Sequence, residues 1–206
     1  KPITTERVEE HRLEPEPYWE EALRRDPGDA RVNTALGIRH LKQARFSEAE
    51  QRFRNAIGRL TANYTSPKDG EPFYYLGVAL AGQARHDEAF DAFAKAAWSE
   101  AWRGSAYFSL AEIAARRRDF SAALEYLDRS LDANALNLRA VNLKAAVLRH
   151  TGRANDALAL LDVAARKTDP LDVRLMTECW LAGGKKAGDE LTATLRDHPN
   201  TGLESA

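Results

Sequence analysis

Cysteine is almost absent from the sequence. Cys179 is the only one in 206 residues, so no disulfide can form within the chain. Neither charge is in excess, because 30 lysines and arginines stand against 31 aspartates and glutamates, and this balance argues against nucleic acid as a partner. No apolar run approaches the roughly 18 to 20 residues that a membrane-spanning helix needs. These absences exclude a disulfide-stapled domain, a basic nucleic-acid binder and a membrane-spanning protein.

The signatures of common enzymes are missing as well. The sequence has no HExxH motif, no His/Cys spacing typical of zinc sites, no glycine-rich phosphate loop and no GxSxG elbow. We therefore predict that the chain is not an enzyme and that it holds no metal and no cofactor. The compartment is left open, with the cytoplasm favoured. Because the chain begins with Lys1 rather than Met, we expect it to be a segment of a longer protein.

Alanine and leucine are abundant and β-branched residues are sparse, which favours helix throughout. Aligning the short turns QARF, QARH, RRDF and TGRA brings four segments into one register, with steps of 40, 34 and 34 residues. Each segment carries a small residue, then an alanine, a large residue and another small one at helical spacing. These four positions are Gly37, Gly77, Ala111 and Ala145; Ala49, Ala89, Ala123 and Ala157; Phe53, Phe93, Leu127 and Leu161; and Ala56, Ala96, Ser130 and Ala164. The pattern predicts units of two helices and an all-α fold.

A polar residue stands two positions before the shared alanine of each second helix. These residues are Ser47, Asp87, Ser121 and Asn155. Their side-chain oxygens can accept hydrogen bonds from the unpaired N–H groups of a first helical turn. The sequence therefore predicts that they are the N-caps of the four second helices.

The register divides the chain into consecutive segments. A lone second helix of a partial repeat is expected at 14–30, and full repeats at 31–69, 70–103, 104–137 and 138–170. The first of these contains an inserted loop, 61–72, which is either a spacer or a functional loop. A degenerate partial repeat is expected at 171–199, whereas residues 1–13 and 200–206 show no clear period and stay unassigned.

The 34-residue unit, with Leu36-Gly37 and Leu76-Gly77 followed by the Ala, Phe, Ala stripe, resembles the tetratricopeptide repeat family. The resemblance implies a right-handed α-solenoid of antiparallel helix pairs, curved into a crescent whose inner surface is made by the first helices. It also implies a non-catalytic scaffold for protein–protein interactions. The sequence departs from the family pattern at the usual tryptophan, which is replaced by Asn33, Phe73, Tyr107 and Val141.

A second resemblance rests on PYWEEALRRDPGDARVNTALG, KDGEPFYYLG and AWSEAW. These phrases are similar to repeat arrays that follow a mutarotase-like, carbohydrate-associated domain in certain large bacterial proteins. This resemblance implies an alternative function, as an accessory or dimerisation module of a larger carbohydrate-active bacterial enzyme. The expected partner is then another domain of the same chain or a second copy, rather than a separate protein or peptide.

The tetratricopeptide resemblance also implies which residues line the concave groove. They are Thr34, Ile38, Tyr74, Val78, Phe108, Glu112, Arg116, Arg139, Asn142 and Arg149. A groove with an apolar, aromatic middle and a basic C-terminal side suits an extended or helical peptide with an apolar anchor and an acidic flank. In the alternative, Tyr74 and Phe108 only pack against neighbouring helices. The family's carboxylate clamp is not expected, because Arg139 alone is basic at one of its positions.

Two other clusters have alternative interpretations. Trp98 and Trp102 either seal the junction between two repeats or form a platform on which a sugar stacks. The run Arg116, Arg117 and Arg118 either complements the dipole at the end of a first helix or contacts an acidic partner.

Overall fold

The computed structural model describes residues 16–62, 69–168, 172–183 and 185–197, and all regular elements within them are α-helices. In chain order these are α2 Glu16–Arg25, α3 Ala30–Lys42, α4 Phe46–Thr61, α5 Glu71–Gly82, α6 His86–Ala96, α7 Glu100–Arg116, α8 Phe120–Ala133, α9 Leu138–His150, α10 Ala154–Lys167, α11 Val173–Leu181 and α12 Lys185–Asp197. The predicted all-α fold is confirmed. Within the described parts, none of the helices has the length and apolar character needed to cross a membrane. Half of the predicted inserted loop 61–72, namely residues 63–68, lies outside the described residues.

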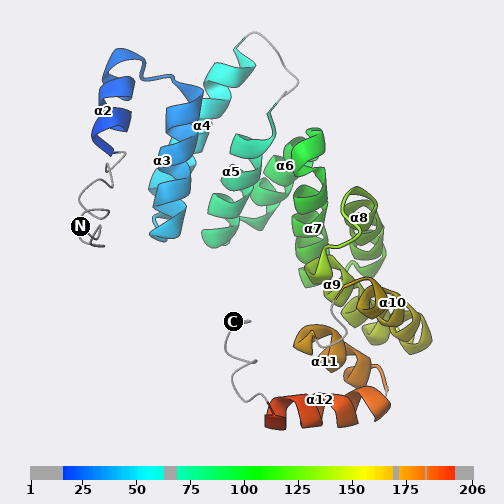
Figure 1. The fold of residues 1–206 in the computed structure, drawn as a ribbon. Helices are drawn as coiled ribbons and strands as arrows, with labels where there is room; N and C mark the ends of the chain where they lie inside the picture. Colours follow the sequence, from blue (N-terminus) through cyan, green and yellow to red (C-terminus); the bar gives the residue numbers. More distant parts are fainter. Residues whose placement is uncertain (1–15, 63–68, 169–171, 184, 198–206) are drawn as a thin grey trace, which may run out of the picture.

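The helices form antiparallel pairs that stack side by side (Figure 1). The first helices α3, α5, α7, α9 and α11 contact one another in succession, whereas the second helices α4, α6, α8 and α10 make no such contact with each other within the described ranges. Because one layer is packed and the other is spread, the array curves (Figure 1). The first helices therefore make the inner surface of the crescent, as predicted.

The stripe of small and large residues forms the interior between the paired helices. Phe53 of α4 is fully buried against Gly37 of α3, where an added Cβ would lie 2.5 Å from the phenyl ring. Phe93 of α6 packs on Gly77 of α5 in the same way, at 2.6 Å. A side chain at either glycine would force the two helices apart, so these residues set how closely each pair packs.

The predicted N-caps are wrong. The second helices begin at Phe46, His86, Phe120 and Ala154, so Ser47, Asp87, Ser121 and Asn155 all lie inside the first turn. The cap positions are held by Arg45, Arg85, Asp119 and Arg153, and among these four Asp119 alone accepts a capping hydrogen bond, from the N–H of Ala122.

The connecting turn explains this error. Each turn contains one residue with a left-handed backbone, with φ of 56°, 60°, 61° and 79° at Ala44, Ala84, Arg118 and Gly152. The next helix starts two residues later in all four turns, so the turn geometry sets where the helix begins and a capping side chain is not required. Besides Asp119, the side-chain caps of the described helices are on first helices, at Asp29, Asn137 and Asp172.

Candidate protein-binding groove

A hollow of about 310 Å³ opens between the first helices at the middle of the inner surface. We call it the central hollow, and it is lined by Tyr74, Val78 and Ala81 of α5, His86 and Phe93 of α6, Ser109, Glu112, Ile113 and Arg116 of α7, and Arg139 of α9. Side chains from three successive first helices meet here because these helices contact one another. Five of the ten groove residues predicted from the sequence lie in this lining.

Tyr74 forms the aromatic wall of the central hollow. Its ring stacks on Trp102, with the ring centroids 4.9 Å apart, and packs on Phe93 at 5.5 Å. Trp102 can reach it because α7 begins at Glu100, so the tryptophan lies in the first turn of that helix. Trp98, by contrast, is 62% exposed. The two tryptophans therefore do not seal the junction together, and Trp102 is a supporting residue that the groove prediction missed.

Phe108 is placed differently from the other predicted groove residues. It is only 6% exposed and packs with Ala111, Leu127 and Ala140 in the core. The guanidinium of Arg139 covers its ring, 4.7 Å from the centroid. The packing alternative thus describes Phe108, and the cation–π contact holds Arg139 in place at the edge of the central hollow.

The charged side chains that line the central hollow form no close ion pairs with one another. Arg139 lies 3.6 Å from the carboxylate of Glu112, which is longer than a good hydrogen bond. Arg116 contacts the ring of His86 at 3.4 Å, and within the described residues no carboxylate lies within ion-pair distance of it. Burial raises the pKa of Glu112 above its ordinary value, and the nearby Arg139 and Arg116 offset this only in part.

The remaining predicted residues flank the central hollow. Thr34 and Ile38 of α3 line a second hollow of about 390 Å³ beside Glu71, but the Thr34 hydroxyl already donates to the carbonyl of Ala30 at 2.7 Å. Asn142 of α9 has a buried side-chain oxygen with no hydrogen-bond partner among the described residues. Arg149 lies 3.6 Å from Glu178 of α11, which offsets the expected positive charge at that end.

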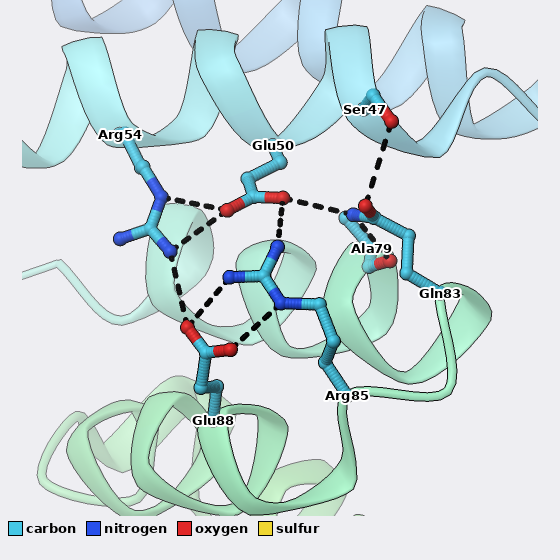
Figure 2. A network of polar contacts seen from close by, with 7 residues as sticks. All are labelled: Ser47, Glu50, Arg54, Ala79, Gln83, Arg85 and Glu88. Atoms are coloured by element: carbon cyan, nitrogen blue, oxygen red, sulfur yellow. Dashed lines mark hydrogen bonds and ion pairs between the residues drawn. The ribbon is translucent and has the colours of Figure 1, made fainter.

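A second charged cluster links the second helices α4 and α6 (Figure 2). The Glu50 carboxylate accepts hydrogen bonds from Arg54 at 2.8 Å, Arg85 at 2.7 Å and Gln83 at 2.9 Å. Arg85 in turn binds Glu88 at 2.6 and 2.7 Å. Burial alone would raise the pKa of Glu50, but the hydrogen bonds from Gln83 and Arg54 outweigh it and lower the pKa. We call these residues the Glu50 network.

The arginine run at the end of α7 has a structural role that the sequence did not indicate. Arg117 forms an ion pair with Asp87 of α6, and its guanidinium lies 5.4 Å from the centroid of the Phe90 ring. It therefore ties two repeats together, whereas Arg116 faces the central hollow. Within the parts of the chain that are described, no group of acidic, histidine or cysteine side chains has the arrangement of a metal site.

Comparisons with known proteins agree with this architecture. A family model described as tetratricopeptide repeat matches residues 34–106 and 108–172. PilF of Pseudomonas aeruginosa is 18% identical over 88% of this chain and 82% of its own, with a TM-score of 0.72. PilW, a type IV pilus biogenesis factor, is 21% identical over 87% of this chain and 82% of its own, with a TM-score of 0.71. YrrB, a protein of the same repeat class with an unusual peptide-binding site, is 16% identical over 91% of this chain and 96% of its own, with a TM-score of 0.62. At these identities the likeness shows the fold alone.

Proposed function

This chain belongs to the tetratricopeptide repeat family, and from that premise we propose that it is a non-catalytic scaffold that binds a peptide or protein segment in its concave groove. The family's fold is typical of scaffolds for protein–protein interactions. A curved stack of helix pairs presents a long inner surface without moving any helix, so a bound segment costs the scaffold little ordering.

One observation carries the proposal, namely the composition of the central hollow. Tyr74 and Val78 supply an apolar wall that can take a side chain of the bound segment, while Arg116 and Arg139 supply charged hydrogen-bond donors beside it. Recognition sites commonly combine an apolar pocket, which gives binding energy, with a few polar groups, which fix orientation. Tyr74 is also held by Trp102 and Phe93, so its ring is already in position before a ligand arrives.

The experiment is a binding measurement with a matched pair of variants. A peptide is first selected on the wild-type chain from a pool of random dodecapeptides. Val78→Asp places a charge in the apolar wall of the central hollow, and Val163→Asp places the same charge on α10, at a valine that is 48% exposed and lies outside the hollow. We expect Val78→Asp to weaken peptide binding by about 10-fold or more, because the new carboxylate must be desolvated.

Val163→Asp should leave the affinity within about twofold, since the substitution is already surrounded by water. Helicity and the melting temperature of both variants are measured alongside, so that loss of binding is separated from loss of fold. Equal affinity of the two variants for the selected peptide would show that the groove is not the binding surface.

One observation favours the alternative, an accessory or dimerisation module of a larger carbohydrate-active enzyme. Large apolar side chains are exposed at Tyr18 on α2 and at Trp180 and Leu181 on α11, and also between these ends, at Trp98 and Leu136. Such residues can contact a neighbouring domain or a second copy. If this alternative holds, Trp180→Ser with Leu181→Ser will abolish self-association measured by sedimentation, whereas Val78→Asp will leave it unchanged.

A further inference from the structure

The central hollow carries positive charge that its own residues do not neutralise. Arg116 contacts a ring nitrogen of His86 rather than a carboxylate, and Arg139 is 3.6 Å from Glu112. Counting Arg116 and Arg139 as +2 and Glu112 as −1 leaves a formal charge of +1 from these three side chains. The two guanidiniums stand on successive first helices, α7 and α9, so their charges face the same space.

Ser109 adds a neutral hydrogen-bond donor to the central hollow. It lines the central hollow and is only 6% exposed, yet its hydroxyl has no hydrogen bond among the residues that the structure describes. A hydroxyl within a helix commonly donates to the backbone carbonyl four residues earlier, as the side chain of Thr34 does. The Ser109 hydroxyl has no such bond, so it can donate to an acceptor that enters the central hollow.

We infer that the central hollow binds the carboxylate of an aspartate or glutamate side chain in the bound segment, held by Arg116, Arg139 and the Ser109 hydroxyl. The inference rests on the proposed function and names the chemistry of its ligand. The two guanidiniums can only donate hydrogen bonds, and the hydroxyl can donate one more, so the three groups together can satisfy a carboxylate. An apolar residue of the same segment lies against Tyr74 and Val78.

Charge balance favours a carboxylate over a phosphate. One carboxylate brings a single negative charge and cancels the formal +1 of the hollow. A phosphorylated side chain brings about −1.5 to −2 and would leave a net negative charge beside Glu112. The carboxylate of Glu112 thus acts as a selectivity element, because it makes the hollow too weakly positive for a dianion.

The test uses the full chain and dodecapeptides whose C-terminus is amidated, so that only side chains can supply a carboxylate. The tightest binder from the random pool is synthesised, and each of its acidic residues is replaced in turn by the matching amide. Fluorescence anisotropy then gives the dissociation constant for the wild-type chain and for Arg116→Gln. We expect one replacement to weaken binding to the wild type by about 10-fold, and binding to Arg116→Gln by at most about twofold.

Two further variants separate binding from folding. Arg118→Gln removes the same charge two residues away, outside the lining of the central hollow, and should retain the 10-fold effect of the amide replacement. Ser109→Ala should weaken the acidic peptide by about threefold or more and leave the melting temperature unchanged, because no internal hydrogen bond is lost.

Three outcomes overturn the inference. These are selected peptides without any acidic residue, an amide replacement that weakens wild type and Arg116→Gln equally, and tighter binding when phosphoserine replaces the critical acidic residue. Failure of this inference and failure of the proposed function give different results. If Val78→Asp abolishes binding but Arg116 shows no coupling to an acidic residue, only the inference fails. If Val78→Asp has no effect on the selected peptide, the proposed function fails with it.

Discussion

The Glu50 network and the central hollow contain similar residues but differ in how completely their charges are paired. In the network, Glu50 is 13% exposed and accepts three hydrogen bonds of 2.7 to 2.9 Å. In the central hollow, the Arg139 to Glu112 contact is 3.6 Å and the hydroxyl of Ser109 is unpaired in the described structure. A closed network serves the fold, whereas an open one leaves donors for a ligand.

The position of each cluster explains the difference. The second helices α4 and α6 spread apart on the outer layer, so long side chains such as Arg54 and Arg85 are what bridge them (Figure 2). The first helices already contact one another through α5 and its neighbours. Charged side chains on the inner surface bridge successive first helices only at the longer distance of 3.6 Å, at Arg139–Glu112 and Arg149–Glu178.

The largest effect is expected at Phe93, because it belongs both to the packed interior between α5 and α6 and to the lining of the central hollow. Its ring is 3% exposed, fills the space left by Gly77 and also lines the central hollow. We expect Phe93→Ala to lower the free energy of unfolding by about 3 to 5 kcal/mol, measured by urea denaturation. Trp98→Ala, at an exposed aromatic in the following turn, should change it by only about 0.5 kcal/mol. Equal effects at the two residues would contradict the packing described here.

Glu50→Ala should separate stability from binding. Removing this carboxylate leaves Arg54, Arg85 and Gln83 without a common acceptor, so the free energy of unfolding is expected to fall by about 1 to 3 kcal/mol. Binding of the selected peptide should stay within about twofold. The control is Glu125→Ala, which removes an exposed i, i+4 pair with Arg129 and should cost roughly 0.5 kcal/mol or less. A large loss of affinity in Glu50→Ala would show that the two clusters are not independent.

The two carboxylates should respond to pH with opposite signs. The pKa of Glu50 is lowered on folding, so its contribution to stability is present above the ordinary value of 4.5 and is lost as the pH falls through the lower folded pKa. The pKa of Glu112 is raised, so its charge disfavours the fold at neutral pH and the penalty disappears as the pH falls from above its folded pKa toward 4.5.

The opposite signs are tested by measuring the free energy of unfolding of the wild type, Glu50→Gln and Glu112→Gln from pH 3 to 8. Glu50→Gln should be less stable than wild type at neutral pH, with the gap closing in acid. Glu112→Gln should be at least as stable as wild type at neutral pH, and its advantage should vanish in acid. Arg116, Arg139 and His86 face Glu112, so the same series in His86→Gln identifies any part that comes from the imidazole. Curves of the same sign for both glutamates would refute the contrast between the clusters.

The smallest effect on stability is expected at Arg116. Because it forms no ion pair within the described residues, Arg116→Gln should change the free energy of unfolding by only about 0.5 kcal/mol. Its effect on an acidic peptide should nevertheless be large. A substantial loss of stability in this variant, measured by the same denaturation, would place Arg116 with the structural charges.

Sequence reasoning succeeded where the determinant is local. The spacing of Gly77, Ala89 and Phe93 follows the helical period, and it correctly predicted which residues are buried. It failed at Ser47, since the start of a helix depends on the backbone of the preceding turn, and it did not place Trp102 against Tyr74. It left open whether Phe108 lines the groove or packs in the core, and burial by α8 and α9 decides this.

The amino-acid sequence alone thus determined the helix pairs, their repeat and the packed interior, because each of these follows from a periodic pattern of side-chain size. Only the tertiary structure decided which charges are satisfied. Arg85 meets Glu50 across 35 residues, and Arg117 meets Asp87 across 30, while Arg116 remains facing the central hollow. Such pairings depend on distances between side chains of different repeats, and these distances are set by the curvature of the whole stack.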